Sequence, residues 1–508
     1  MEDFFIGTAL LFTDPIGIAV FLGGLVGGLV FGAIPGLSLL TLAAILLPFS
    51  AWLKPEHAIM LYGVIYVSGV YGGAVTAILF NIPGSVENAP TAFDGYPMTR
   101  KGEAGKAIGF AVTCSAIGGT ISAVLMMVAT APIAELAIST FGPVEVFALI
   151  FFGLTVVAGV GTRSLAKGWL SLFLGLTLGS VGGDPVGAVP RFTFGTLYLT
   201  GGINFVPLIL GFFAVTEVFI QGQRVAAGTF IASKVAVAYP SFREFWGLKL
   251  AIARSTAIGW LCGLLPGIGA TLAAFVSYNE AVRWSRHPET FGKGDPEGVV
   301  APETANNAAT GAAMIPLLAL GLPGGALTAI MIGVFNMHDM EIGPLIMVEA
   351  HDLVWVLFAS MFWASLAILF LGIVEAKGIV HLLRIPFPIL APCILIFATI
   401  GTYALRASIV DIYVMFAAGV VGFFMRRSDY SIPAVVMGVI LGQIGENVFS
   451  QAMVMVDYSF LGFFDLGVSG AFVVGGIATV IYTVYRHTRT FVTGLGRKDG
   501  LRNAKPGS

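Results

Sequence analysis

Four short glycine–proline segments interrupt the apolar runs of this 508-residue chain, and they are the residues most able to do chemistry. They are residues 32–38 (GAIPGLS), 81–85 (NIPGS), 263–269 (GLLPGIG) and 321–325 (GLPGG). A helix that is broken inside a membrane exposes backbone N–H groups at one end and carbonyl oxygens at the other. The N–H end carries partial positive charge and suits a carboxylate, whereas the carbonyl end suits a small cation.

Two adjacent amides, Asn306 and Asn307, accompany these segments. They lie in a run that has no charged side chain between Glu303 and His338. Polar side chains inside a membrane need partners and commonly mark a transport path, so we expect this run to line a binding site. Two structural alternatives remain open: the amides could cap a helix or bond between helices, and the prolines could be plain kinks.

The sequence therefore predicts a site that holds an anion by backbone amides and neutral side chains rather than by an arginine. The predicted substrate-binding residues are Pro35, Gly36, Ser38, Thr41, Asn81, Pro83, Gly84, Ser85, Pro266, Gly267, Thr304, Asn306, Asn307, Pro323 and Gly324. The predicted cation-binding residues are Asn307, Thr310 and Gly321. The three cysteines fit no metal or disulfide spacing, so no metal site and no cofactor beyond a coupling Na⁺ or H⁺ is expected.

The composition is that of a membrane protein. The chain is 57% hydrophobic and 11% charged, whereas soluble domains are about 25% charged. Apolar runs long enough to cross a bilayer predict an all-α polytopic fold with about 11 to 14 membrane elements. A net charge of −2 gives no basic footprint for nucleic acid. No Walker motif or Ser/His/Asp arrangement is present, which argues against a primary pump and against an enzyme.

The breaks recur in the same order, which indicates an internal repeat. Pro35 and Pro266 are separated by 231 residues, and Pro83 and Pro323 by 240. The tail carries six Lys and Arg residues, which places the C-terminus in the cytoplasm, and the acidic N-terminus is better placed outside. The two halves would then enter the membrane from opposite sides as inverted repeats, and matching breaks in two such halves point to a binding site at the midplane.

We expect four regions along the chain. They are a first membrane half at 1–220, a cytoplasmic connector at 221–254, a second membrane half at 255–485, and a disordered cytoplasmic tail at 486–508. A polar loop is expected at 94–103. Its charged residues, Asp94, Arg100, Lys101 and Glu103, have either a gating role or a merely solvated surface position.

Long motifs give the chain a family resemblance. They are GAIPGLSLLTLAAILLPF at 32–49, YGGAVTAILFNIPGSVENAPTAFDGYPMTRKGEAGKAIG at 71–109, GLLPGIGATLA at 263–273 and PETANNAATGAAMIPLLALGLPGGALTAIMIGVF at 302–335. With these motifs the chain resembles the large membrane subunit of the tripartite tricarboxylate transporters, the TctA family. The resemblance implies secondary transport across a bacterial inner membrane, driven by sodium or protons. It also implies a small membrane subunit and a periplasmic solute-binding protein as partners.

The predicted function is cation-coupled import of small carboxylates by alternating access, in contact with membrane lipid. The alternatives left open are a passive anion channel and a structural membrane subunit. A channel would show flux that does not saturate and that needs no ion gradient. A membrane enzyme is a third alternative and would require a catalytic arrangement that the sequence lacks.

Overall fold

The protein is almost entirely helical. The computed structural model describes residues 2–502 apart from 35–36, 160–163, 185–186, 188, 225–238, 268, 383–386 and 466. Within these residues the only strands are β1 (Gly182–Gly183) and β2 (Pro190–Arg191), which pair antiparallel. Eight described helices are long and apolar enough to cross a membrane, and five shorter ones are also apolar. The prediction of an all-α polytopic membrane protein is confirmed.

The chain forms two compact units, each built from two separate stretches of sequence. Unit 1 comprises Met1–Thr140 and Ile203–Phe424. Its elements are α1 (Glu2–Thr13), α2 (Pro15–Ala33), α3 (Leu39–Ser50), α4 (Pro55–Phe80), η1 (Val86–Asn88), α5 (Ala89–Arg100), α6 (Ala104–Thr140), α10 (Phe205–Ile209), the π-helical η2 (Leu210–Val215), α11 (Thr216–Arg224), α12 (Phe242–Gly247), α13 (Lys249–Leu264), α14 (Gly269–Trp284), η3 (Pro288–Thr290), α15 (Glu297–Ala312), α16 (Met314–Leu320), α17 (Ala326–Met337), α18 (Ile346–Glu349), α19 (His351–Leu382), α20 (Phe387–Arg406) and α21 (Ile409–Arg427).

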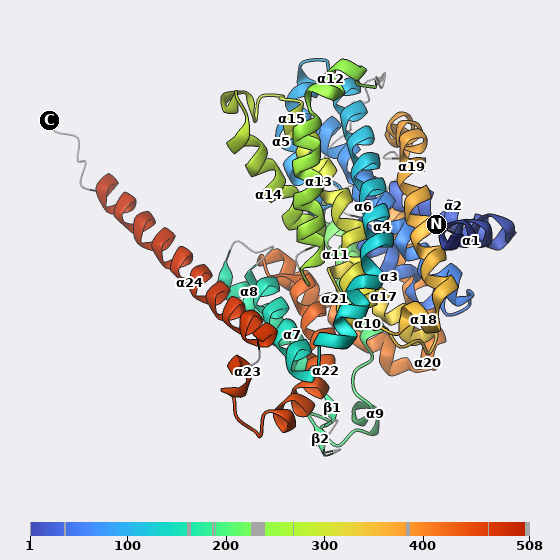
Figure 1. Cartoon of the computed structure of the whole chain (residues 1–508), viewed down its shortest axis with the longest axis vertical. Helices are drawn as coiled ribbons and strands as arrows, with labels where there is room; N and C mark the ends of the chain where they lie inside the picture. Colours follow the sequence, from blue (N-terminus) through green and yellow to red (C-terminus); the bar gives the residue numbers. More distant parts are fainter. Residues whose placement is uncertain are drawn as a thin grey trace. The chain divides into compact units, whose positions relative to one another are not determined.

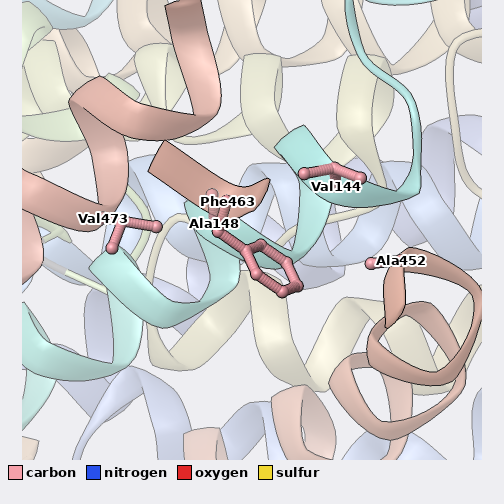
Figure 2. Close-up of a cluster of buried hydrophobic side chains, with 5 residues drawn as sticks. All are labelled: Val144, Ala148, Ala452, Phe463 and Val473. Carbon is pink, nitrogen blue, oxygen red and sulfur yellow. The ribbon is translucent and has the colours of Figure 1, made fainter. Parts of the chain in front are cut away.

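Unit 2 comprises Phe141–Gly202 and Met425–Ser508. Its elements are α7 (Pro143–Gly159), α8 (Leu165–Gly179), β1, β2, α9 (Leu197–Thr200), α22 (Ile432–Met455), α23 (Gly462–Asp465) and α24 (Gly467–Arg502). Figure 2 shows one cluster of its buried side chains, which consists of Val144, Ala148, Ala452, Phe463 and Val473. The cluster joins α7 to α22, α23 and α24, so helices from both sequence stretches of unit 2 share an apolar core.

Two helices that are buried on all sides form the centre of unit 1. Nearly every residue of α4 and every residue of α15 after Glu297 is buried. A helix that is buried all round needs covering helices on every face. Helices α2, α5, α6, α17 and α19 pack against α4, while α5, α6, α13 and α14 pack against α15. In Figure 1, α5, α13, α14 and α15 can be followed side by side at the end of unit 1 that also carries α12.

Close glycine contacts repeat between the two central helices and their covers. A Cβ atom on Gly28 or Gly32 of α2 would overlap or crowd the backbone of α4 at Ile65 and Gly69. A Cβ on Gly259 or Gly263 of α13 would overlap the backbone of α15 at Ala305 and Ala309.

The glycine pairs are 231 residues apart and the contacted pairs are 240 apart, which are the offsets of the sequence breaks. Small residues spaced G-x-x-x-G allow such close approach in membranes. The internal repeat is therefore visible in the packing, while the opposite membrane orientation of the two halves stays a prediction.

Some local expectations need correction. The polar loop expected at 94–103 is wrong for residues 94–100, because they form the end of α5. Proline in the first turn of α5 starts the helix, and burial of Thr91, Asp94 and Met98 on one side holds it. Helix α24 continues to Arg502, so most of the tail is helical rather than disordered. Helix α13 begins at Lys249, inside the segment 221–254; residues 225–238 of that connector lie outside the described residues.

Candidate functional site

The second and fourth breaks have the same backbone geometry. Asn81 caps the end of α4 with φ 57°, and Gly321 caps the end of α16 with φ 70°. The N–H groups of Asn81 and Ile82 donate to Ala77 O and Thr76 O, and those of Gly321 and Leu322 donate to Leu317 O and Pro316 O. The bond from each left-handed residue to the carbonyl four residues back is that of the αL helix ending, a conformation that glycine and asparagine accept.

The residues that follow the ends of α4 and α16 also have equivalent contacts. Gly84 N donates to Gly73 O at 3.3 Å, and a Cβ on Gly324 would crowd the backbone of Ala313, the position 240 residues after Gly73. Each break then leads into a new helix through an extended residue, Ser85 before η1 and Gly325 before α17. The two Pro-Gly segments are therefore structural equivalents and not isolated kinks.

All four breaks lie within unit 1 and touch one another in pairs. A Cβ on Gly84 of the second break would overlap Gly32 O of the first. Gly269 of the third break lies against Gly324 and Gly325 of the fourth, and a Cβ on Gly325 would be 3.8 Å from Tyr66 Oη on α4. The pairs are joined further because α3 packs against α17, and η1 packs against α14. Pro35 and Gly36 lie outside the described residues.

Helices begin directly after the breaks, which concentrates helix N-termini here. Helix α3 starts after the first break, η1 and α5 after the second, α14 after the third and α17 after the fourth. Ser38 caps α3 by accepting a hydrogen bond from Thr41 N at 3.3 Å, and the hydroxyls of these residues are also 3.3 Å apart. The first N–H groups of a helix lack partners within that helix and favour negative charge, so this arrangement is able to hold an anion.

The prolines and glycines of the third and fourth breaks supply shape rather than polar side chains. Pro266, Pro323 and Gly324 are buried, and Gly267 has a φ of 81°, which favours glycine. In the second break, Pro83 is half-buried and the Asn81 side chain is exposed. The predicted residues of these breaks are therefore brought together mainly through their backbone.

The amide pair is fully buried in α15. Asn307 Nδ2 donates to Val67 O of α4 at 3.1 Å. In the described part of the chain, Asn306 Oδ1 and Asn307 Oδ1 have no hydrogen-bond partner. Buried carbonyl oxygens without partners are costly in the protein interior, so they need a donor or a cation. Thr304 and Thr310 donate to their own helix, to Val300 O at 2.7 Å and to Asn307 O at 2.8 Å.

A buried carboxylate that the sequence reasoning missed lies on the same helix. Glu303 is 0% exposed. Its Oε1 accepts from Thr91 Oγ1 at 2.5 Å and from Asn88 Nδ2 at 3.3 Å, and its Oε2 accepts from Ser115 Oγ at 2.9 Å. The available signal was its spacing of three and four residues from the two amides, which places all three on neighbouring positions of one helix. The predicted wholly uncharged lining therefore has an acidic group beside it.

The residues expected at a gate separate into two groups. Asp94 is buried and accepts from Gly294 N at 2.8 Å, Asp295 N at 2.9 Å and Tyr278 Oη at 2.8 Å. It therefore ties α5 to α14 and to the loop that precedes α15. Arg100, Lys101 and Glu103 are exposed at the end of α5 and do not join it.

A separate cavity of about 610 Å³ lies away from the breaks. It is lined by residues of α1, by Asp14, Lys54 and His57, and by the start of α19 around His351. None of the four break segments lines it. Within the described residues there is also no group of three or more His, Cys, Asp or Glu side chains that could hold a metal ion.

Comparison with known proteins places the chain in a family. The family model described as "Tripartite tricarboxylate transporter TctA family" matches residues 18–437. An uncharacterized 52.8 kDa protein in the TAR-I ttuC' 3'region of Agrobacterium vitis is 35% identical over 470 residues, which cover 92% of this chain and 93% of that protein.

A second Agrobacterium vitis protein, uncharacterized and in the TAR-II ttuC' 3'region, is 36% identical over 197 residues, or 39% of this chain and 81% of that protein. No solved structure matches the chain. The family match spans the helices that carry the four breaks. The chain is a multi-pass membrane protein that belongs to the tripartite tricarboxylate transporter TctA family.

Proposed function

We propose that this chain imports small carboxylates of the tricarboxylate or dicarboxylate class by cation-coupled alternating access. The observation that carries the proposal is the meeting of four helix breaks, in two equivalent pairs, around two helices that are buried on all sides. Equivalent breaks in two halves of a transporter are where substrate and coupling ions bind. The family match supports transport as the activity.

An anion is the favoured substrate because the breaks supply helix N-termini. A helix starts after each break, and the free N–H groups and dipoles of these helices stabilise a carboxylate without a paired side chain. The hydroxyls of Ser38, Thr41 and Ser85 stand at or next to these N-termini and add neutral donors. Such a site releases its ligand more readily than a buried ion pair, because no charge is left unpaired after release.

The coupling cation is Na⁺ or H⁺ in this proposal. Asn307, Thr310 and Gly321 are its proposed ligands if the ion is Na⁺. Support comes from Asn307 Oδ1, a buried oxygen without a partner in the described residues, and from Gly321, where α16 ends and its last carbonyls become free.

The proposed assembly contains a small membrane subunit and a periplasmic solute-binding protein that delivers the substrate. The tripartite architecture named in the family description supports it. We place the assembly in a bacterial inner membrane with the C-terminus of this chain in the cytoplasm. The Lys and Arg residues of the tail support that orientation.

The test is uptake into vesicles that contain the full chain with both partner subunits. Radiolabelled citrate, malate, succinate and tartrate serve as probes, each with a sodium gradient, a pH gradient or neither. We expect one of them to enter saturably and to accumulate only when a cation gradient is imposed. Flux that does not saturate and needs no gradient would instead identify a channel, and no uptake of any probe would contradict the proposed substrate class.

A further inference from the structure

Glu303 is a carboxylate without a cationic partner in the interior of unit 1. No Lys, Arg or His side chain among the described residues forms an ion pair with it. An ionised carboxylate that is buried in this way is expensive unless strong hydrogen bonds or a bound cation stabilise it. A group of this kind inside a membrane protein marks a functional site by default.

The hydrogen-bond partners of Glu303 fit both of its protonation states. Thr91 and Ser115 bond it through hydroxyl groups, and a hydroxyl can either donate to a carboxylate or accept from a carboxylic acid. Asn88 presents its amide nitrogen, which is a donor and cannot ligate a metal cation. The surroundings of Glu303 therefore suit the binding and release of a proton better than the binding of sodium.

A short chain of hydrogen bonds joins Glu303 to the second break. Ser85 Oγ donates to Asn88 Oδ1 at 2.6 Å, and Asn88 Nδ2 donates to Glu303 Oε1 and to Val70 O. Ser85 is half-buried at the end of the break, and Asn88 is fully buried. A change in the state of the carboxyl group is thus two hydrogen bonds away from the proposed substrate segment.

Within the described residues, no charged group on the helices around α15 forms an ion pair with Glu303. Titratable groups near Glu303 are Tyr71 of α4, which also lies near Glu375, and Cys114 of α6, and none of them is a cation. Several charged groups on these helices have other partners: Asp94 of α5 with Tyr278 of α14, Arg254 of α13 with Glu297, Lys106 of α6 with Glu244, and Arg283 with Glu280 on α14. Glu87 of η1 lies near Tyr66 of α4 and Ser85, and it is itself acidic. No described cation replaces the proton as a neutralising partner of Glu303 in this arrangement.

We propose that Glu303 is the site of the coupling proton, and that the Ser85–Asn88 pair connects its protonation to substrate binding at the second break. The inference rests on the proposed function and identifies the proton as its coupling ion. Glu303 takes up a proton when the site faces outward with substrate bound, which removes the buried charge before the helices move. It releases the proton to the cytoplasmic side after the substrate leaves.

The test compares two transport modes of the full chain with both partners in vesicles, using whichever labelled carboxylate the wild-type complex takes up. Glu303→Gln mimics the permanently protonated state. We expect it to lose accumulation driven by a pH gradient but to keep exchange of labelled for unlabelled substrate, because exchange needs no net proton release. Glu297→Gln, an acid at the start of the same helix that pairs with Arg254, is the matched control and should keep both modes.

The outcomes separate the inference from the proposed function. If the wild type shows neither exchange nor uptake, the proposed function fails. If the wild type exchanges substrate but Glu303→Gln still accumulates it under a pH gradient, or if only a sodium gradient drives the wild type, the proton site is wrong.

A second variant covers the case in which Glu303→Gln does not insert into the membrane. Ser115→Ala removes one donor from the ionised carboxylate, so the pH dependence of uptake should shift to higher pH. Ser122→Ala is its control, because Ser122 lies on the same α6 surface and bonds Ala308 O and Ala312 N of α15 but not Glu303. An unchanged pH profile for Ser115→Ala, or an equal shift for Ser122→Ala, overturns the proposal.

Discussion

Asn307 of α15 donates a hydrogen bond from Nδ2 to Val67 O of α4 at 3.1 Å, and these two residues are separated by 240 positions. That separation is also the offset between the second and fourth breaks. Residues that are equivalent by the repeat and touch each other lie where the two halves meet. The bond therefore marks a contact between the halves at their shared centre, and it holds one of the two buried amides in place.

The first prediction concerns this bond. Asn307→Ala removes the donor to Val67 O and the unpartnered Oδ1, so substrate uptake should be abolished while the protein still inserts and folds. The expected stability loss is only about 1 kcal/mol, as for one hydrogen bond. Uptake and thermal melting in detergent check both parts. Asn447→Ala, on the exposed face of α22, is the control and should change neither.

The second prediction concerns Pro323 in the fourth break. Pro323→Ala frees the backbone of a buried turn and adds an N–H group, so the hairpin loses the shape that the proposed site requires. We expect uptake to be lost and expression to be kept. Pro433→Ala, at an exposed position in the first turn of α22, should transport normally. Normal uptake by Pro323→Ala would remove the fourth break from the site.

The third prediction concerns the left-handed ending of α16. Gly321 has a φ of 70°, and a Cβ there would also lie 2.9 Å from Ile342 O. Gly321→Ala should therefore destabilise the protein by about 1–2 kcal/mol. Gly378→Ala is the matched control, because a Cβ at that helical glycine meets no atom within 4 Å. A lower melting temperature for Gly321→Ala alone is the expected result; equal melting of the two variants would argue against the strained ending.

The fourth prediction concerns the close packing of α2 on α4. A Cβ on Gly32 would overlap the carbonyl of Gly69, so Gly32→Ala should cost about 1–3 kcal/mol through overpacking. Gly23, on the same helix, has open space around its Cβ position. Gly23→Ala should be neutral or slightly stabilising. Melting curves of the two variants, measured side by side, show whether the packing of α2 on α4 at Gly32 is as close as described.

The fifth prediction concerns the three hydrogen bonds by which Asp94 holds the loop before α15. Asp94→Ala leaves the N–H groups of Gly294 and Asp295 and the Tyr278 hydroxyl without their acceptor. The loop before α15 should then exchange its amide hydrogens faster, which hydrogen–deuterium exchange measures. Tyr278→Phe removes only one of the three bonds and should have a smaller effect. If the amide hydrogens of residues 285–296 exchange at an unchanged rate in Asp94→Ala, Asp94 does not hold this loop in place.

The sequence was sufficient for the fold class and for the location of the breaks. Long apolar runs can cross a membrane only as helices, because backbone groups must be bonded internally in lipid. Glycine and proline mark where a helix must stop, and in the structure Asn81 caps the end of α4 and Gly321 caps the end of α16, as the motifs indicate. The offsets of 231 and 240 are properties of the sequence, and the packing of Gly32 and Gly263 follows them.

The sequence was insufficient for Asp94 and Glu303. Charged residues next to an apolar run ordinarily face water, so the sequence predicts Asp94 in a polar loop and Glu303 only at the edge of a membrane stretch. Their burial depends on donors that are distant in the chain: Gly294 and Asp295 for Asp94, and Ser115 for Glu303. A local sequence pattern cannot predict a hydrogen-bond partner that lies about 200 residues away along the chain.

What the sequence by itself determined is a helical membrane protein whose helices are broken at four Pro-Gly motifs, because helix formation and its interruption are decided by neighbouring residues. Only the tertiary structure decided that α4 and α15 are the buried centre, that Asn307 contacts Val67, and that Glu303 has three neutral donors from the other half. These contacts depend on how covered helices pack, and close packing joins residues irrespective of their distance along the chain.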